Sequence, residues 1–352
     1  MKMCKQWGVT FIELMVAMVL GLLLLGGIIH VYLGTKTTYQ VTEGMSRMQE
    51  NTRFSIDMLA RDIRMAGYIP CSQPADSNNV VNPSTDDWWR PIFDDGGIQG
   101  FEAGVSTFPP SISDVADGTD AILIRRAGNQ VAAVNFLDTV SDQFVMQRSL
   151  GTSWSADNLE GRLLIACDPS HASLFQVGDV STGSTTRVSI SPVSGGKNPG
   201  NNSTNLGRAF GNDAHLATYS PIIYYIAESN SGDGNSLFKE YIYAKNNDDI
   251  ESEREELLEG VESMQILYGI DESVDGVANR YVPAGVVEAA DAWGSVVTVR
   301  IGLLFASEDG MRTADDFDDN TYLVANTLID PTNDRRKRYV SSITVNIRNT
   351  NI

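Results

Sequence analysis

The hydrophobic positions of the first 67 residues follow two successive patterns. Residues 9–33 form an apolar run in which Glu13 is the only charged side chain, preceded by a short basic leader that ends at Gly8. A helix over these 25 residues is about 37 Å long, enough to cross a bilayer. Further on, apolar or small residues recur at positions 41, 45, 48, 52, 56, 59, 63 and 66. These steps of three and four predict an amphipathic helix.

The two patterns predict one continuous helix. No proline occurs between residues 9 and 69, and Gly67 followed by Pro70 is a typical C-terminal stop. We therefore expect a helix of about 59 residues, about 88 Å long. Its charged face carries Lys36, Glu43, Glu50, Arg53, Asp57, Arg61 and Arg64. The opposite stripe should pack against the protein's own globular part, with a coiled-coil partner as the alternative.

The remaining residues, 68–352, show the patterns of strands. Apolar or alternating runs lie at residues 121–124, 163–166, 222–226, 296–305 and 341–347. In the last run every second residue from Ser341 faces one side, as in a half-buried strand. Residues 255–269 are compatible with a short helix that ends as a strand, and residues 191–207 with a disordered loop. We expect an α+β fold in which one long N-terminal helix packs on a single large β-rich head.

Charge is concentrated in the head. Residues 68–352 hold 40 acids and 19 bases, a net charge of 19 − 40 = −21, whereas residues 34–67 are nearly neutral. So acidic a head disfavours nucleic acid as a direct ligand and favours solubility. The basic cluster RRKR, at residues 335–338, directly precedes a predicted strand. We interpret it as a solvated strand flank or an internal partner for nearby acids, with an anionic binding partner as the alternative.

Glu13 is unusual because a carboxylate inside a membrane span costs about 2.5–3.5 kcal/mol on insertion scales. If the chain is cut after Gly8, the new α-amino group of Val9 lies four residues before Glu13, about one helical turn away. That amine can pair with Glu13 of its own chain or of the next subunit in a stack of parallel helices. Glu13 would then set the register of polymerisation.

Two ordinary interpretations of the apolar run compete with this one. A secretory signal peptide would not place Glu13 inside its apolar region, and no A-x-A-like cleavage site follows Gly27. A plain membrane anchor fits the length but leaves Glu13 without a partner. In either membrane interpretation, leader lysines Lys2 and Lys5 stay inside, so the chain after Leu33 should face the periplasm.

The residues from Gly8 to Leu14, G-V-T-F-I-E-L, resemble the class III signal of type IV prepilins and type II secretion pseudopilins. The resemblance implies that a membrane peptidase cuts between Gly8 and Val9, that the amine of Val9 is methylated and that Glu13 is needed for subunit assembly. The usual first mature residue is Phe. Val9 stands at that position instead. This difference bears on the efficiency of methylation more than on the cleavage itself.

Cysteine usage predicts one disulfide. Cys4 would leave with the leader, so the mature chain keeps only Cys71, just past the long helix, and Cys167, at the end of a predicted strand. In an oxidising periplasm these two should pair and join the base of the helix to a sheet. Two free buried thiols are the alternative. The sequence offers little for a metal site, because it has no CxxC and only three histidines.

The sequence lacks common catalytic motifs. It contains no GxSxG, no HExxH, no phosphate-binding glycine loop and no Cys/His pair at a telling spacing. Acid pairs such as Asp86/Asp87 and Asp318/Asp319 are interpreted as parts of solvated loops, since the chain is so acidic. We therefore expect no catalytic residues and no cofactor.

One acidic motif is a weak candidate for a calcium-binding turn. In DESVDG, at residues 271–276, Asp271, Ser273 and Asp275 imitate the start of a calcium loop. The twelfth position of that loop is Val282 rather than glutamate, which excludes an EF-hand. A plain β-turn is the alternative.

Longer stretches narrow the resemblance to the PilW family of minor type IV pilins. They are SRMQENTRFSIDMLARDIRMAGYIPC, GIQGFEAG, GTDAILIRRA, LLEGVESMQILYGIDE, WGSVVTVRIGLLFAS and RRKRYVSSITVNIRN. The resemblance implies a low-abundance subunit that, with other minor pilins, primes pilus assembly and sits at or near the pilus tip. A J-type pseudopilin of type II secretion is the first alternative. A membrane-tethered periplasmic enzyme that uses its acidic pairs is a remote second one.

The resulting organisation has four parts: leader 1–8, membrane and assembly half of the helix 9–33, amphipathic half 34–67, and periplasmic head 68–352. The implied partners are other minor pilins, the major pilin, the prepilin peptidase, the inner-membrane assembly platform and a tip adhesin, with no direct nucleic-acid ligand. The chain is expected in the inner membrane as a single-pass protein before assembly and on the cell-surface pilus afterwards.

Overall fold

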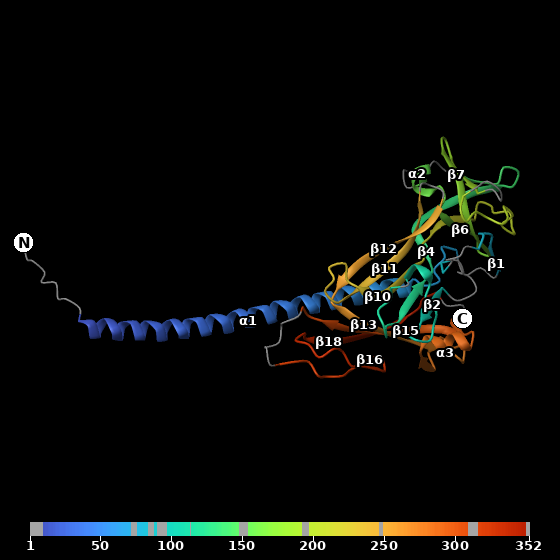
Figure 1. The fold of residues 1–352 in the computed structure, drawn as a ribbon. Helices are drawn as coiled ribbons and strands as arrows, with labels where there is room; N and C mark the ends of the chain where they lie inside the picture. The colour runs from blue at the N-terminus through green and yellow to red at the C-terminus, as the bar shows by residue number, and fades with distance from the viewer. Residues whose placement is uncertain are drawn as a thin grey trace, which may run out of the picture.

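A long helix joined to a β-rich head makes up the described part of the chain (Figure 1). The computed structural model describes residues 10–71, 76–83, 88–89, 97–112, 114–147, 154–191, 197–245, 249–308 and 316–349. The helix, α1 (Phe11–Arg64), projects far from the head at its N-terminal end, while its C-terminal half lies along the sheets. The expected α+β, pilin-like fold is confirmed.

Helix α1 is continuous over 54 residues, in agreement with the single helix predicted. Met65 caps its C-terminus, and Gly67 follows with a φ of 71°, a conformation that glycine adopts without strain. The N–H of Gly67 donates a hydrogen bond of 2.9 Å to the carbonyl of Arg125. The predicted stop is therefore the point at which the chain leaves the helix and joins the head.

The largest sheet forms a closed ring. Its strands are β1 (Asp76–Asn79), β4 (Ala127–Asp138), β5 (Gln143–Met146), β6 (Leu163–Cys167), β7 (His171–Thr182), β8 (Thr186–Ile190) and β9 (His215–Tyr219). They are ordered β1-β7-β6-β9-β4-β5-β8, and a further pairing of β7 with β8 closes the strands from β4 to β9 into a ring, while β1 pairs with β7 alone. Phe144 packs inside it against Phe175 and Phe210, at ring-centroid distances of 5.4 and 5.8 Å. The ring lies at the end of the head away from the free end of α1 (Figure 1).

Two smaller sheets complete the head. The five-stranded sheet contains β2 (Ile98–Phe101), β3 (Ala121–Ile124), β10 (Ile222–Glu228), β11 (Asn235–Lys245) and β12 (Asp249–Glu259), ordered β12-β11-β10-β3-β2. The four-stranded sheet contains β13 (Val261–Ile270), β14 (Arg280–Val282), β15 (Val296–Ala306) and β18 (Arg338–Asn346), ordered β14-β13-β15-β18. A hairpin of β16 (Tyr322–Val324) and β17 (Thr327–Ile329) lies between β15 and β18 in the chain. The short helix α2 (Ala156–Leu159) lies between β5 and β6, and α3 (Ala284–Ala289) lies between β14 and β15.

The five-stranded sheet is the middle layer of the head. Tyr224 of β10 points into a core shared with α1 and the four-stranded sheet. Its neighbours Ile223 and Tyr225 point into a second core, shared with the seven-stranded sheet. Strand β10 is therefore buried on both faces, which explains why its sequence, IIYYI, is a continuous apolar run.

The predicted stripe is the buried face of the second half of α1. Met48, Leu59 and Ile63 are buried in the same core as Tyr224, and Thr52 is buried as well. The charged residues expected on the opposite face are all exposed. The stripe thus packs against the chain's own head, as predicted.

The predicted strands are confirmed, and two neighbouring segments need correction. Residues 255–269 contain no helix: β12 and β13 run through them, separated by Gly260, which has a φ of 80°. The disordered loop predicted at 191–207 is wrong for residues 197–207, because Asn201 is fully buried and its amide donates to the carbonyls of Gln176 and Ser191 at 2.9 and 3.0 Å. Residues 192–196 lie outside the described part.

Cys71 and Cys167 form the predicted disulfide, which spans 96 residues of sequence and ties the segment after α1 to β6. Cross-links that close long loops typically contribute about 2–4 kcal/mol. We expect the double variant Cys71→Ser/Cys167→Ser to lose that amount of unfolding free energy, measured by denaturant titration of the full chain in detergent. Cys4→Ser, in the leader, is the matched control. A double variant as stable as this control would contradict the prediction.

Candidate functional site

The N-terminus of α1 contains the acid that the sequence singles out. Thr10 is the N-cap, and its hydroxyl accepts a hydrogen bond of 3.3 Å from the N–H of Glu13. The Glu13 carboxylate in turn accepts from the N–H of Thr10 at 2.9 Å and from its hydroxyl at 3.0 Å. This reciprocal capping box satisfies backbone donors that a helix end leaves open. It places the carboxyl group of Glu13 at the positive end of the helix dipole.

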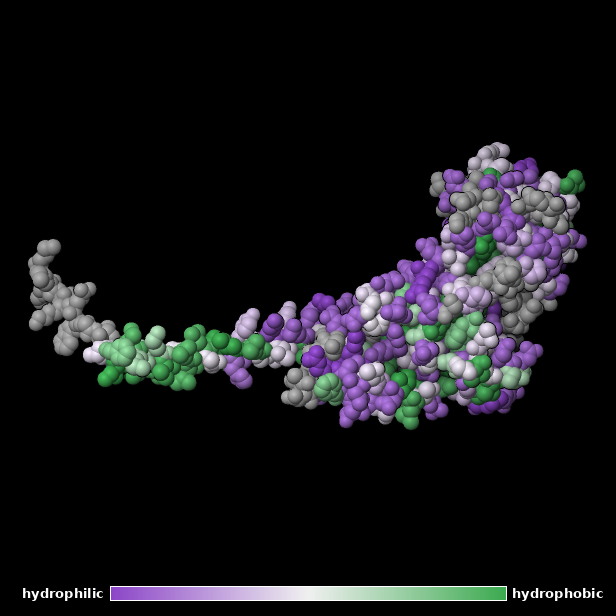
Figure 2. All heavy atoms as spheres, in the orientation of Figure 1, coloured by the Kyte–Doolittle hydropathy of each residue, from purple (hydrophilic) through white to green (hydrophobic). Residues whose placement is uncertain are grey.

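The helix beyond this cap is apolar and uncovered. Side chains such as Phe11 and Leu24 are exposed by 75% and 70%, and no described residue packs on this part of α1. Figure 2 shows hydrophobic surface gathered along the N-terminal half of α1, while the head is mostly hydrophilic. So large an apolar surface on one helix needs lipid or other helices around it.

A buried ion pair fastens the other end of α1 to the head. Asp62, 10% exposed at its side chain, accepts a hydrogen bond of 3.2 Å from the Arg126 guanidinium. Its second oxygen accepts one of 2.5 Å from the hydroxyl of Tyr224. Burial, followed by the charge of Asp62, raises the pKa of Tyr224 well above its ordinary value, so the hydroxyl keeps its proton. Helix, β10 and the β3–β4 connection thus meet at one carboxylate.

Removing that carboxylate should destabilise the head. We expect Asp62→Ala to cost about 3 kcal/mol of unfolding free energy, because it leaves the Arg126 charge and the Tyr224 hydroxyl without their acceptor. Asp57→Ala, on the exposed face of the same helix, is the matched control and should change stability by less than about 0.5 kcal/mol. Denaturant titration of the two full-length variants measures both unfolding free energies. Equal stabilities would show that the ion pair does not hold helix and head together.

Two residues of the basic cluster at 335–338, Arg336 and Arg338, pair with acids of the head, as one of the three interpretations of this cluster expects. Arg338 is buried at the start of β18 and pairs with Glu262, Asp318 and Asp334 at 2.7–3.0 Å. Asp318 is itself fully buried, so the interpretation of the pair Asp318/Asp319 as solvated is wrong for its first member. Asp86 and Asp87 lie outside the described residues.

The DESVDG turn uses its first acid to bind its own backbone. Asp271 accepts from the N–H groups of Ser273, Val274 and Gly276 at 3.0, 2.7 and 2.7 Å. Burial alone would raise the pKa of Asp271, but these hydrogen bonds hold it below its ordinary value. Asp275 accepts from the N–H of Val277 at 2.9 Å. These contacts are those of a tight Asx-type turn.

The structure brings together only some of the predicted site residues. The cleavage and methylation positions, Gly8 and Val9, lie outside the described residues, so their roles stay predictions. Glu13 stands at one end of α1, and the disulfide at the other. The Asp62–Arg126–Tyr224 contact was not predicted from the sequence. Its one signal is that Asp62 falls beside Leu59 and Ile63 on the apolar stripe, where an acid needs a buried partner.

Comparison with known families finds two matches, one at each end of the chain. The family Type IV Pilus-assembly protein W, PilW, matches residues 223–349, and the prokaryotic N-terminal methylation motif matches residues 3–29. The chain is a type IV pilin-family protein. The methylation motif contains Gly8, Val9 and Glu13, and the PilW match runs through the strands from β10 to β18.

The two matches support a role for this pilin in pilus assembly. They also support a head domain that is anchored in the membrane by α1 and is later incorporated into a pilus. Such proteins are structural parts of an assembly rather than enzymes. The seven-stranded sheet of the pilin lies outside both matched ranges. A search of curated proteins and a search of solved structures each find no match to the pilin.

Proposed function

We propose that this chain is a minor pilin that primes pilus assembly together with other minor pilins and sits at or near the pilus tip. The observation that carries the proposal is the seven-stranded sheet. It stands to one side of the axis of α1 at the far end of the head (Figure 1). In a shaft of closely stacked parallel helices, so broad a head crowds its neighbours at every repeat. A tip position needs room for only a few copies.

The remaining parts of the proposal concern partners and location. Before assembly the uncovered half of α1 lies in the inner membrane with the head in the periplasm, and the prepilin peptidase cuts after Gly8. The same helix surface then packs against other minor pilins and the major pilin on the assembly platform. A tip adhesin is the natural partner for the far end of the head. The PilW match favours this assembly over type II secretion.

The tip position can be tested by labelling. The turn between β4 and β5 contains Val140, which is 96% exposed, so an epitope inserted there should not disturb the fold. We expect immunogold on sheared pili to mark one end of each filament. The major pilin, labelled in the same way, should be marked along the shaft. Gold spaced along the shaft for this chain would contradict the tip position.

Priming has a separate readout. Deleting the gene should lower the number of pili per cell without shortening those that form, since priming acts on initiation. Secretion through a type II system should be unchanged. Normal pilus numbers together with lost secretion would instead identify a pseudopilin.

A further inference from the structure

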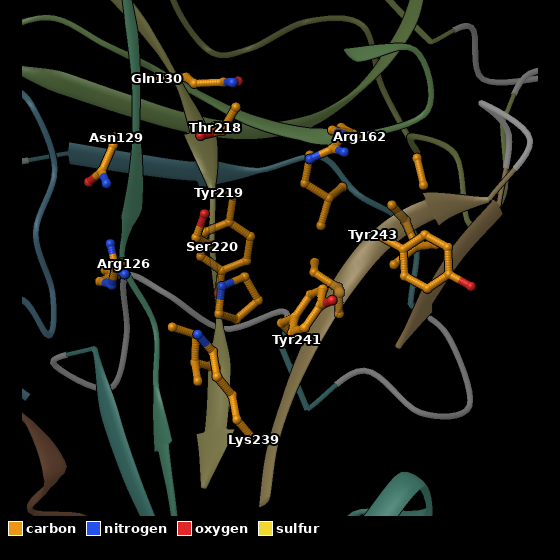
Figure 3. A pocket seen from close by; sticks show the side chains of 16 residues that line it. Arg126, Asn129, Gln130, Arg162, Thr218, Tyr219, Ser220, Lys239, Tyr241 and Tyr243 are labelled. Carbon is orange, nitrogen blue, oxygen red and sulfur yellow. The ribbon is translucent and has the colours of Figure 1, made fainter. Parts of the chain in front are cut away.

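A cavity of about 360 Å³ lies where the seven-stranded and five-stranded sheets meet. Its walls come from β4, β6 and β9 on one side and from β10, β11 and β12 on the other (Figure 3). Its volume falls within the range of small-ligand pockets. One wall belongs to the PilW-matched part and the other to the unmatched ring.

An irregularity in the β4–β9 ladder shapes this cavity. Ala127 pairs with Tyr219 and Val131 with Ala217, so β4 has extra residues opposite Thr218. The backbone at Gly128 leaves no room for a side chain, because a Cβ there would lie 2.3 Å from the Thr218 hydroxyl. Bulges of this kind turn side chains out of the ladder. Here Asn129 and Gln130 border the cavity, and their amides can both donate and accept hydrogen bonds (Figure 3).

The charge of the cavity is opposite to that of the chain. Three bases, Arg126, Arg162 and Lys239, line it, and none of the described lining residues is acidic, although the chain carries a net charge of −19. Arg126 is neutralised by Asp62, but its buried Nε–H has no hydrogen-bond partner among the described residues. Arg162 and Lys239 form no ion pair with a described residue. The cavity therefore offers two cationic groups to an anion.

Two tyrosines form an aromatic wall on β11. Tyr241 and Tyr243 are two residues apart and so face the same side of the strand. Their hydroxyls donate to Glu253 and Glu251 of β12 at 3.0 and 3.2 Å, which holds the rings in place. The Lys239 ammonium lies 6.0 Å from the centre of the Tyr241 ring. A flat apolar face thus stands beside a cation.

We propose that this cavity binds a saccharide that carries a carboxylate. The Tyr241 ring stacks on the C–H face of the sugar, and the amides of Asn129 and Gln130 bond its hydroxyls. Arg162 and Lys239 pair with the carboxylate. The site adds ligand recognition to the head and does not depend on where the subunit sits in the pilus.

The surroundings favour this ligand over a polyanion. Glu251 and Glu253 stand at the tyrosine hydroxyls, and Glu255 lies directly opposite Lys239 on β12. Together with the acidic head, they repel a chain of closely spaced phosphates. An acidic saccharide presents one carboxylate per sugar unit among neutral hydroxyls, which matches two cations, two amides and an aromatic face.

The test uses the full chain in detergent and calorimetric titration with digalacturonate as the probe. Neutral galactobiose, inorganic phosphate and a thymidine dinucleotide are the comparison ligands. The variants are Arg162→Gln/Lys239→Gln, which removes the charge, and Tyr241→Leu, which removes the aromatic face. Arg187→Gln is the matched control, because Arg187 is an exposed strand arginine outside the cavity.

We expect digalacturonate to bind at least tenfold more tightly than galactobiose, with the affinity falling as salt is raised. The double variant and Tyr241→Leu should each weaken binding at least tenfold, and Arg187→Gln should not. The variants should keep the unfolding midpoint of the parent chain, because Arg162 is exposed and Lys239 partly so. Absent binding, equal binding of galactobiose, or tighter binding of phosphate or dinucleotide would overturn the proposal. Binding that survives in both cavity variants would do the same.

Discussion

Replacing Glu13 with alanine is expected to leave the chain in the membrane and to remove it from assembled pili. Losing the carboxylate makes insertion easier, so the membrane pool should not shrink. What disappears is the one negative charge in the apolar half of α1, and with it the pairing with a neighbouring N-terminal amine. Immunoblots of the membrane fraction and of sheared pili measure the two quantities separately.

The capping box supplies a sharp control for this variant. Thr10→Val removes the hydroxyl that caps the helix but keeps the Glu13 carboxylate. Loss of an N-cap costs about 1 kcal/mol, a local effect on the first turn. Thr10→Val should therefore still enter pili. If Glu13→Ala is found in pili at the parent level, or if Thr10→Val is excluded as strongly, the carboxylate does not act as a register device.

Substituting Gly8 with alanine is expected to stop removal of the leader. The resemblance to class III prepilins implies a cut between Gly8 and Val9, and without that cut no amine would form one turn before Glu13. The intact mass of the purified chain should then retain residues 1–8, whereas the parent chain should lose them and gain a methyl group on Val9.

A substitution at a second glycine tests whether leader cleavage depends on Gly8 itself or on any glycine of this region. Gly26→Ala lies within the same apolar run, has open space around it and should be cleaved normally. A Gly8→Ala chain with the mature mass would show that cleavage occurs elsewhere. The mass spectrum also reports methylation directly, which matters because Val9 stands where the family usually has Phe.

Local patterns in the sequence predicted the elements that depend on local physics. The stripe through Met48 and Ile63, the stop at Gly67 and the apolar run of β10 each follow from periodicity or backbone preference. The disulfide followed from having only two cysteines outside the leader. For the stripe, the stop and the apolar run, a short stretch of sequence contained the whole signal, whereas the disulfide followed from the small number of cysteines.

Contacts between distant residues were beyond the same reasoning. Tyr224 lies 162 residues after the Asp62 that it meets, and no spacing in the sequence marks the pair. Asp318 looked solvated because acids surround it in sequence, yet the fold buries it against Arg338. The cavity between the sheets required the register of β4 and β9 to be known. Such sites depend on how sheets stack, which local propensity does not specify.

The fastening of α1 to the head also defines how the molecule carries mechanical load. A pull along the helix axis reaches its C-terminal end, where the Asp62 ion pair and the Cys71–Cys167 bond are anchored nine residues apart in the chain. The first passes force to the middle sheet, and the second passes it covalently into β6 of the ring. Tension is therefore divided between two sheets and bypasses the loops that connect them, so the head resists being drawn out strand by strand.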